Sequence, residues 1–218
     1  MPCKHVLGHG PELARALAAW RSVALSSAPA AAAALELRPL ELDPAAGQAA
    51  LAAALDGLDG LDGDGASAFV ALDARFLNGM RLDLMASLRL RGIVMPALVE
   101  PGALVAAGVR MDDNCWIGAG AIIQHGSRIG FNTVIGAGAI VGSGVTVGHS
   151  AWIDEGVVIG RGARIGAQVT LGLGVIVGHG RQIGKLSIVD KAGRIEHDIA
   201  AKTFIHATHA QPIVIIGA

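Results

Sequence analysis

The sequence predicts a mainly β fold, in which a parallel β-helix over residues 95–198 follows a small α/β domain, a degenerate Rossmann-like unit, over residues 1–94. Three observations favour this fold class: a six-residue repeat through the second half of the chain, an abundance of glycine, and a scarcity of aromatic residues. The repeat stops before the end of the chain. We therefore expect residues 199–218 to form a C-terminal tail, whose apolar run at residues 213–216 packs as a strand on the β-helix or on a neighbour.

The repeat is defined by a large aliphatic residue that returns at every sixth position from Val99 to Ile195, with a small or β-branched residue two positions before it. Helices and ordinary strands have other periods. A short strand and a sharp corner every six residues close into a coil after three hexads, which is the repeat of a parallel β-helix. Residues eighteen apart should therefore stack at about 4.8 Å, the spacing of neighbouring strands. One interior column is expected to contain Ile117, Ile135, Ile153 and Leu171.

The composition agrees with this fold. Of 218 residues 31 are glycine and none is tyrosine, as expected where corners are tight and the cross-section leaves little room for rings. A net charge of -1 gives no support to nucleic-acid binding. The two cysteines, Cys3 and Cys115, are too few for a disulfide framework. Cys115 occupies a small inward slot of the repeat, where a free thiol behaves as a small hydrophobe.

The first domain is expected to begin with a strand at residues 5–7, a turn formed by Gly8, His9 and Gly10, and a helix towards Trp20. A turn between a strand and a helix can direct backbone N–H groups at a phosphate. An ordinary strand-to-helix turn has the same composition, so both interpretations stand.

Two further elements are expected before the β-helix: a strand at residues 68–72 and a helix at residues 76–90 that ends before Gly92. Residues 26–54 are rich in alanine and predict a helix with loops. Residues 55–67 repeat Leu-Asp-Gly, which suggests calcium, but the spacing lacks the alternating acidic ligands of a calcium loop and favours a solvated loop. The second helix has an apolar face, formed by Met80, Leu84, Met85 and Leu88.

The apolar start of the chain is interrupted by Glu12, Arg15 and Arg21, which argues against a signal peptide. No apolar run is long enough to cross a bilayer. We therefore expect a cytoplasmic protein without a membrane partner.

The hexads Gly-Ala-Gly-Ala-Ile-Val (residues 136–141) and Gly-Ser-Gly-Val-Thr-Val (residues 142–147) resemble those of the hexapeptide-repeat acyltransferases. The run at residues 69–73 and the entry to the hexads at residues 92–97 are similar to the sialic-acid O-acetyltransferase and nucleotide 4-amino-sugar N-acetyltransferase family. This resemblance implies a left-handed β-helix, a homotrimer, acetyl-CoA or another acyl-CoA as co-substrate, and a sugar or nucleotide-sugar acceptor.

The resemblance also implies roles for particular residues. His125 stands where the family has its catalytic base, and the backbone N–H of Ser143, one coil further along, where the family has its oxyanion donor. The same edge, through Gly142, Arg161 and His179, would hold the cofactor. The glycine turn (Gly8, His9 and Gly10) would bind the nucleotide sugar.

The sequence departs from the family at several positions. Met95 replaces a histidine, Gly126 replaces the acidic residue after the catalytic histidine, and Val134 replaces a second histidine. The family's Gly-x-Pro-Ala ending is replaced by the tail. An alternative is therefore a catalytically weakened β-helix that serves as an assembly or binding module.

A metal enzyme is a further alternative, because hexapeptide-repeat carbonic anhydrases bind zinc through histidines. His125, His149, His179 and His197 share one phase of the hexad. Zinc ligands must converge within about 2.1 Å of one ion, whereas His125 and His179 are three coils apart, roughly 14 Å at the strand spacing. We therefore expect no metal site within one chain.

Overall fold

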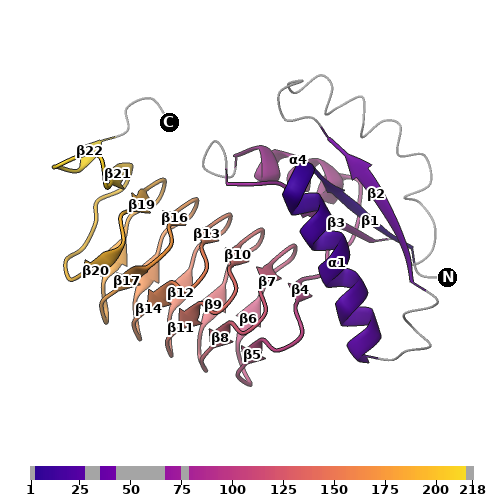
Figure 1. Ribbon diagram of the computed structural model, residues 1–218, viewed down its shortest axis with the longest axis horizontal. Helices are drawn as coiled ribbons and strands as arrows, with labels where there is room; N and C mark the ends of the chain where they lie inside the picture. The colour runs from indigo at the N-terminus through magenta and orange to yellow at the C-terminus, as the bar shows by residue number, and fades with distance from the viewer. Residues whose placement is uncertain (1–2, 28–34, 43–66, 75–78, 215–218) are drawn as a thin grey trace. The chain divides into compact units, whose positions relative to one another are not determined.

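The computed structural model describes residues 3–27, 35–42, 67–74 and 79–214 (Figure 1). The chain divides into two compact units, Met1–Leu98 and Val99–Ala218. The expected Leu-Asp-Gly loop lies outside the described residues, except for Ser67. No helix in the described ranges has the length and apolar character needed to span a membrane.

Within the residues that the structure describes, the first unit contains a parallel three-stranded sheet in the order β2-β1-β3 with two helices. Its elements are β1 (Cys3–Gly8), α1 (Gly10–Ser27), β2 (Glu36–Glu41), β3 (Ser67–Ala71) and α4 (Gly79–Leu90). The strands predicted at residues 5–7 and 68–72 and the helices predicted towards Trp20 and at residues 76–90 are present where the structure describes them. The helix with loops predicted over residues 26–54 is wrong at Glu36–Glu41, which form β2, an edge strand with four of its six residues exposed.

The core of this unit lies between the sheet and its helices. Trp20 of α1 packs edge-on against Phe69 of β3, with ring centroids 5.7 Å apart. Leu84, Met85 and Leu88 of α4 are buried, as the apolar face of that helix predicts. Burial of these apolar side chains is the main stabilising contribution.

The second unit is a parallel β-helix, as the hexad predicts (Figure 1). Neighbouring strands within each sheet are eighteen residues apart, so Ile135 pairs with both Ile117 and Ile153. The strands before the C-terminal end are β4 (Leu98–Val99), β5 (Leu104–Val105), β6 (Arg110–Met111), β7 (Trp116–Ile117), β8 (Ile122–Ile123), β9 (Arg128–Ile129), β10 (Val134–Ile135), β11 (Ile140–Val141), β12 (Thr146–Val147), β13 (Trp152–Ile153), β14 (Val158–Ile159), β15 (Arg164–Ile165), β16 (Thr170–Leu171), β17 (Val175–Val177), β18 (Gln182–Ile183), β19 (Ile188–Asp190) and β20 (Gly193–Ile195).

Both inward slots of the hexad are filled as predicted. The aliphatic residues from Ile117 to Val189 are buried. Where the small slot holds a polar residue, that residue donates to a carbonyl oxygen of the next coil: Ser127 Oγ to Gly142 O at 2.9 Å, and Cys115 Sγ to Gly130 O at 3.2 Å. The small slots therefore add hydrogen bonds that tie successive coils together.

The corners of the coil use two solutions. At two of the three edges a glycine adopts a positive φ, as at Gly126 (φ 73°) on one edge and Gly138 (φ 65°) on the other. At the third edge the same conformation is taken by Asn114, Asn132, Ser150 and Gln168. Asparagine tolerates the left-handed region because its short polar side chain can hydrogen-bond locally. The amide Nδ2 of Asn114 donates to Oδ1 of Asn132 (2.9 Å), and that of Asn132 to Oγ of Ser150 (3.0 Å).

The β-helix continues beyond the point where the hexad ends. Ile199 bridges Ile183, and β21 (Thr203–His206) pairs in parallel with β19, so the last coil is two residues shorter than the others. An antiparallel strand, β22 (Ile213–Val214), then pairs with β21. The strand predicted in the tail is present at Ile213–Val214. The first part of the tail, through His206, instead extends the coil.

The three sheets of the β-helix have different outer surfaces, because the residue just before each inward aliphatic residue points outward. The arginine face is the sheet β18-β15-β12-β9-β6 and carries Arg110, Arg128, Thr146, Arg164 and Gln182. The tryptophan face is the sheet that contains β7, β10 and β13, and it carries Trp116, Val134 and Trp152. The aliphatic face is the sheet β20-β17-β14-β11-β8-β5 and carries Leu104, Ile122, Ile140, Val158 and Ile176.

Candidate functional site

The His125 edge is the corner that follows each strand of the aliphatic face. Backbone hydrogen bonds stack its turns in the predicted column: Gly144 N donates to His125 O (3.0 Å), and the N–H groups of Gly162 and Gly180 make the equivalent bonds one and two coils further along. The structure therefore brings together His125, Ser143, Arg161 and His179 on successive coils.

The imidazole of His125 is exposed and makes no hydrogen bond or ion pair with any residue that the structure describes. It lines an open groove of about 400 Å³ together with Gln124, Ile122, Leu104 and Ala106. The walls of this groove are apolar apart from His125 and Gln124. An unengaged imidazole beside an apolar groove is able to accept a proton from a bound nucleophile.

Gly126 follows the histidine, where the family has an acidic residue. Its φ of 73° lies in the left-handed region, as do those of Gly144, Gly162 and Gly180 at the same corner of the later coils. Glycine has the lowest cost in this conformation. The fold thus gives a structural reason for Gly126, and the imidazole lacks a carboxylate from the following residue.

The backbone N–H of Ser143 lies one coil beyond His125. On either side of it, Gly142 N donates to Ile159 O (2.8 Å) and Gly144 N to His125 O, so both flanking N–H groups belong to the ladder between coils. The N–H of Ser143 has no acceptor among the described residues. An open backbone N–H next to a base is the group that an oxyanion requires.

Gly142 has a steric role. A β-carbon at this position would lie 2.7 Å from the backbone nitrogen of Arg161. The glycine therefore allows the two coils to approach, and its contribution to a cofactor site would be made through the backbone.

Arg161 and His179 make a direct contact with each other. The backbone N–H of Arg161 donates to Nδ1 of the His179 imidazole at 3.1 Å. The sequence analysis assigned both residues to the cofactor without this contact. The side chain of Arg161 is exposed, whereas its backbone N–H is already engaged.

Two further histidines lie away from the His125 edge. His149 lies on the third edge of the coil, the one that turns at Asn114 and Asn132, and its ring stacks on Phe131. His206 lies on β21, with Nε2 3.6 Å from Asp190 Oδ2. Within the described ranges no three histidine, cysteine, aspartate or glutamate side chains are placed to hold a metal ion.

The glycine turn of the first unit joins β1 to α1. A β-carbon on Gly8 would lie 2.2 Å from the carbonyl oxygen of Ala71, so this glycine is required by the close approach of β1 and β3. His9 Nδ1 lies 3.8 Å from Glu41 Oε1, at the carboxyl edge of the parallel sheet. Ligands of parallel α/β sheets commonly bind at this edge.

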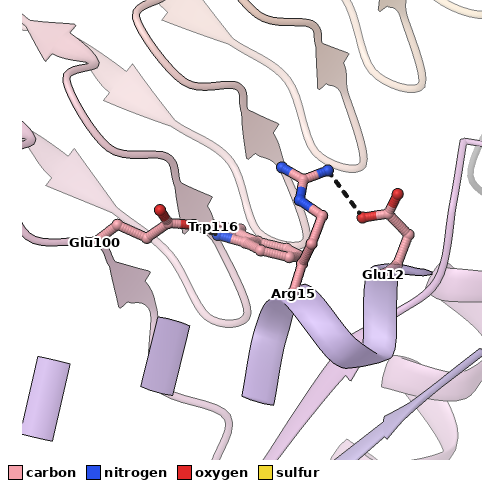
Figure 2. A network of polar contacts seen from close by, with 4 residues as sticks. All are labelled: Glu12, Arg15, Glu100 and Trp116. Atoms are coloured by element: carbon pink, nitrogen blue, oxygen red, sulfur yellow. Dashed lines mark hydrogen bonds and ion pairs between the residues drawn. The ribbon is translucent and has the colours of Figure 1, made fainter. Parts of the chain in front are cut away.

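Carboxylates beside tryptophans are a feature that the hexad did not predict. Trp116 Nε1 donates to Glu100 Oε1 at 2.7 Å (Figure 2). Further along the tryptophan face, burial and then the neighbouring Glu155 raise the pKa of Asp154 to about 6. Pairs between coils are sixteen to nineteen residues apart, and such a spacing is recognisable only once the coil length is known.

Comparisons with known proteins agree with the fold. Residues 108–143 match the family model described as bacterial transferase hexapeptide (six repeats). No curated protein matches the chain.

Among solved structures, PerB from Caulobacter crescentus, in complex with CoA and GDP-perosamine, is 23% identical with a TM-score of 0.73, and 96% of each chain is covered. The acetyltransferase domain of PglB from Neisseria gonorrhoeae is 19% identical with a TM-score of 0.76, covering 98% of this chain and 100% of that domain. A complex of the same domain with acetyl coenzyme A has a TM-score of 0.61 at 20% identity. The chain is therefore a hexapeptide-repeat β-helix protein with an amino-terminal α/β unit.

Proposed function

We propose that the chain is an acyl-CoA-dependent N- or O-acyltransferase, with acetyl as the transferred group and a sugar or nucleotide sugar as the acceptor. The observation that carries this proposal is the pairing of an unengaged imidazole, His125, with an open backbone N–H, that of Ser143, on adjacent coils. The similar structures support the substrate classes, because PerB holds CoA and GDP-perosamine and the PglB domain holds acetyl coenzyme A.

The chemistry follows from these two groups. His125 accepts the proton of the acceptor's amine or hydroxyl group as that group attacks the thioester carbonyl carbon. The N–H of Ser143 donates to the oxygen that becomes negatively charged. When the tetrahedral species collapses, the C–S bond breaks, and the imidazolium of His125 returns the proton to the leaving thiolate. The proton balance closes without any further residue.

Two side chains on the His125 edge are suited to binding an acyl-CoA. The exposed side chain of Arg161 offers a cation to a phosphate, and the outward edge of His179 remains accessible. We propose that the glycine turn with His9 binds the nucleotide of the acceptor, since it lies at the carboxyl edge of the sheet. This reaction would take place in the cytoplasm, as the sequence analysis expects.

We propose further that the active form is a homotrimer. The aliphatic face carries a continuous column of apolar side chains from Leu104, which is 63% exposed, to Ile176, which is 38% exposed. Contiguous exposed apolar surface marks interaction sites. Leu104 and Ile122 also line the groove beside His125, so a second copy packed on this face would provide the missing wall of the site.

The experiment that tests the function is a mass-spectrometric screen of acyl-CoA consumption with nucleotide-sugar acceptors. Acceptor-dependent release of CoA, together with an acceptor whose mass has increased by one acyl group, is the expected result. Absence of CoA release with every acceptor would instead support the binding-module alternative suggested by Gly126 and Val134.

A further inference from the structure

Each turn of the His125 edge has a backbone N–H that points outward from its second residue. These N–H groups are chemically equivalent, but they are not all free to bind an external acceptor. Ser143 and Arg161 occupy this position on neighbouring coils, about 4.8 Å apart at the strand spacing. The N–H of Ser143 is open, whereas that of Arg161 donates to Nδ1 of His179. The difference between the two positions is therefore the imidazole of His179.

The imidazole of His179 is placed by the hydrogen bond from Arg161 N and by the neighbouring coil. The ring lies against Gly160, where an added β-carbon would be 2.7 Å from Nδ1. Its own backbone carbonyl accepts a hydrogen bond from Nε of Arg181 at 3.3 Å. Because Nδ1 accepts a hydrogen bond, it carries no proton, and the ring can occupy the N–H of Arg161 without repelling it.

At another edge of the coil, a side chain likewise accepts a hydrogen bond from an outward backbone N–H. There Glu100 Oε2 accepts the N–H of Ala119 at 3.2 Å. A side chain from a neighbouring coil can therefore withdraw a corner N–H from external ligands.

We propose that His179 is a positioning residue that sets the register of the acyl-CoA. With the N–H of Arg161 engaged, the N–H of Ser143 is the open donor at this turn position on the two coils that follow His125. Without His179 the carbonyl would have two alternative donors, and in the second register it would lie one coil away from the base. A displacement of that size removes the reacting carbon from the reach of the nucleophile that His125 activates. This inference deepens the proposed function and rests on it.

The test compares His179→Ala with His179→Asn in steady-state kinetics. Alanine opens the N–H of Arg161 and so permits unproductive binding, which lowers kcat and KM by the same factor and leaves kcat/KM unchanged. The hydrogen bond at stake predicts a fall of about 2-fold to 10-fold in each parameter. Asparagine places Oδ1 where His179 has Nδ1 and should restore both parameters. A merely structural role would not produce this proportional change or this rescue.

Other outcomes overturn the inference. A lower KM with unchanged kcat would mean that His179 only competes with the cofactor, and unchanged kinetics would mean that it does nothing. A fall in kcat/KM that asparagine does not rescue would indicate general damage. In all three cases the wild type still turns over, so the proposed function stands. A wild-type chain without acyl transfer would overturn the function and the inference together.

Discussion

The imidazole of His149 stacks on the ring of Phe131 from the preceding coil, with centroids 4.7 Å apart and planes inclined by 3°. Burial lowers the pKa of His149 from its ordinary value of 6.5. The folded state therefore binds fewer protons at this site than the unfolded state. The stability of the protein should rise as the pH increases from the lowered pKa of the folded state to 6.5.

The first prediction concerns this pair. His149→Phe keeps an aromatic ring on Phe131 but removes the titrating group. The wild type should lose thermal stability as the pH falls below 6.5, and the variant should lose less. Melting temperatures measured from pH 8 to pH 5 would check this. Parallel curves for the two proteins would show that the stacked histidine does not contribute.

The second prediction concerns Asp154, whose pKa is raised from 3.8 to about 6 by burial and by Glu155. Since the folded state holds the proton more tightly, ionisation destabilises the fold as the pH rises from 3.8 to 6, and the full cost is present above that range. Asp154→Asn should therefore stabilise the protein at pH 7, on the order of 1 kcal/mol after allowance for solvent exposure.

The comparison for Asp154 is internal, because below pH 4 both proteins are neutral at this position. The free energies of unfolding of the two proteins, measured with denaturant, should differ at pH 7 and agree below pH 4. A variant that is less stable than the wild type at pH 7 would mean that the carboxylate makes a favourable contact.

The third prediction concerns the side-chain hydrogen bonds that link Asn114, Asn132 and Ser150 on successive coils. Asn132 is buried, has a φ of 60° and is hydrogen-bonded to Asn114 and Ser150. Asn132→Ala should destabilise the protein by roughly 2–4 kcal/mol, through unpaired buried groups and a left-handed β-carbon. Asn132→Gly loses the same bonds without that clash, so it should be more stable than alanine by about 1 kcal/mol. Equal unfolding free energies would contradict the role of φ.

The sequence predicted most of the β-helix because each hexad must bury an aliphatic residue whatever surrounds it. The same rule placed Cys115 in an inward slot and His125 on an outer corner. It did not predict the last coil, where the interval from Ile195 to Ile199 is four residues and the period breaks. It did not predict β2 either, because Pro39 and alternating charges obscure a strand that is tolerated at a sheet edge.

The sequence predicted the edge on which each site residue lies, but it did not predict the contacts that these residues make. The period places Arg161 and His179 on one edge, yet it does not specify how an exposed side chain folds back. The hydrogen bond from Arg161 N to His179 Nδ1 depends on space above Gly160, which only the structure shows. Similarly, the abundance of glycine indicated tight corners, but it did not predict that one edge turns at Asn114 and Asn132, which are hydrogen-bonded to each other.

The fourth prediction concerns the trimer. Ile140 lies in the middle of the aliphatic face, and Thr146 lies in the middle of the arginine face on the next strand of the chain. Ile140→Glu should convert the trimer into monomers and reduce acyl transfer, because a charge would be buried at the interface. Thr146→Glu is the matched control and should remain trimeric. Sedimentation velocity at micromolar concentration measures both, and a monomeric wild type would refute the proposed assembly.

The last prediction is the catalytic one. If His125 is the base, His125→Ala should lower turnover by roughly 10²-fold to 10⁴-fold, the range for loss of a general base. Binding of CoA, measured by calorimetry, should change little, because the proposed cofactor contacts are made by Arg161 and by later coils. His149→Ala is the control, since His149 lies on a different edge and should leave turnover intact. Full activity of the His125 variant would remove the base from the proposed chemistry, and Gly126 and Val134 would then count as evidence for a binding module.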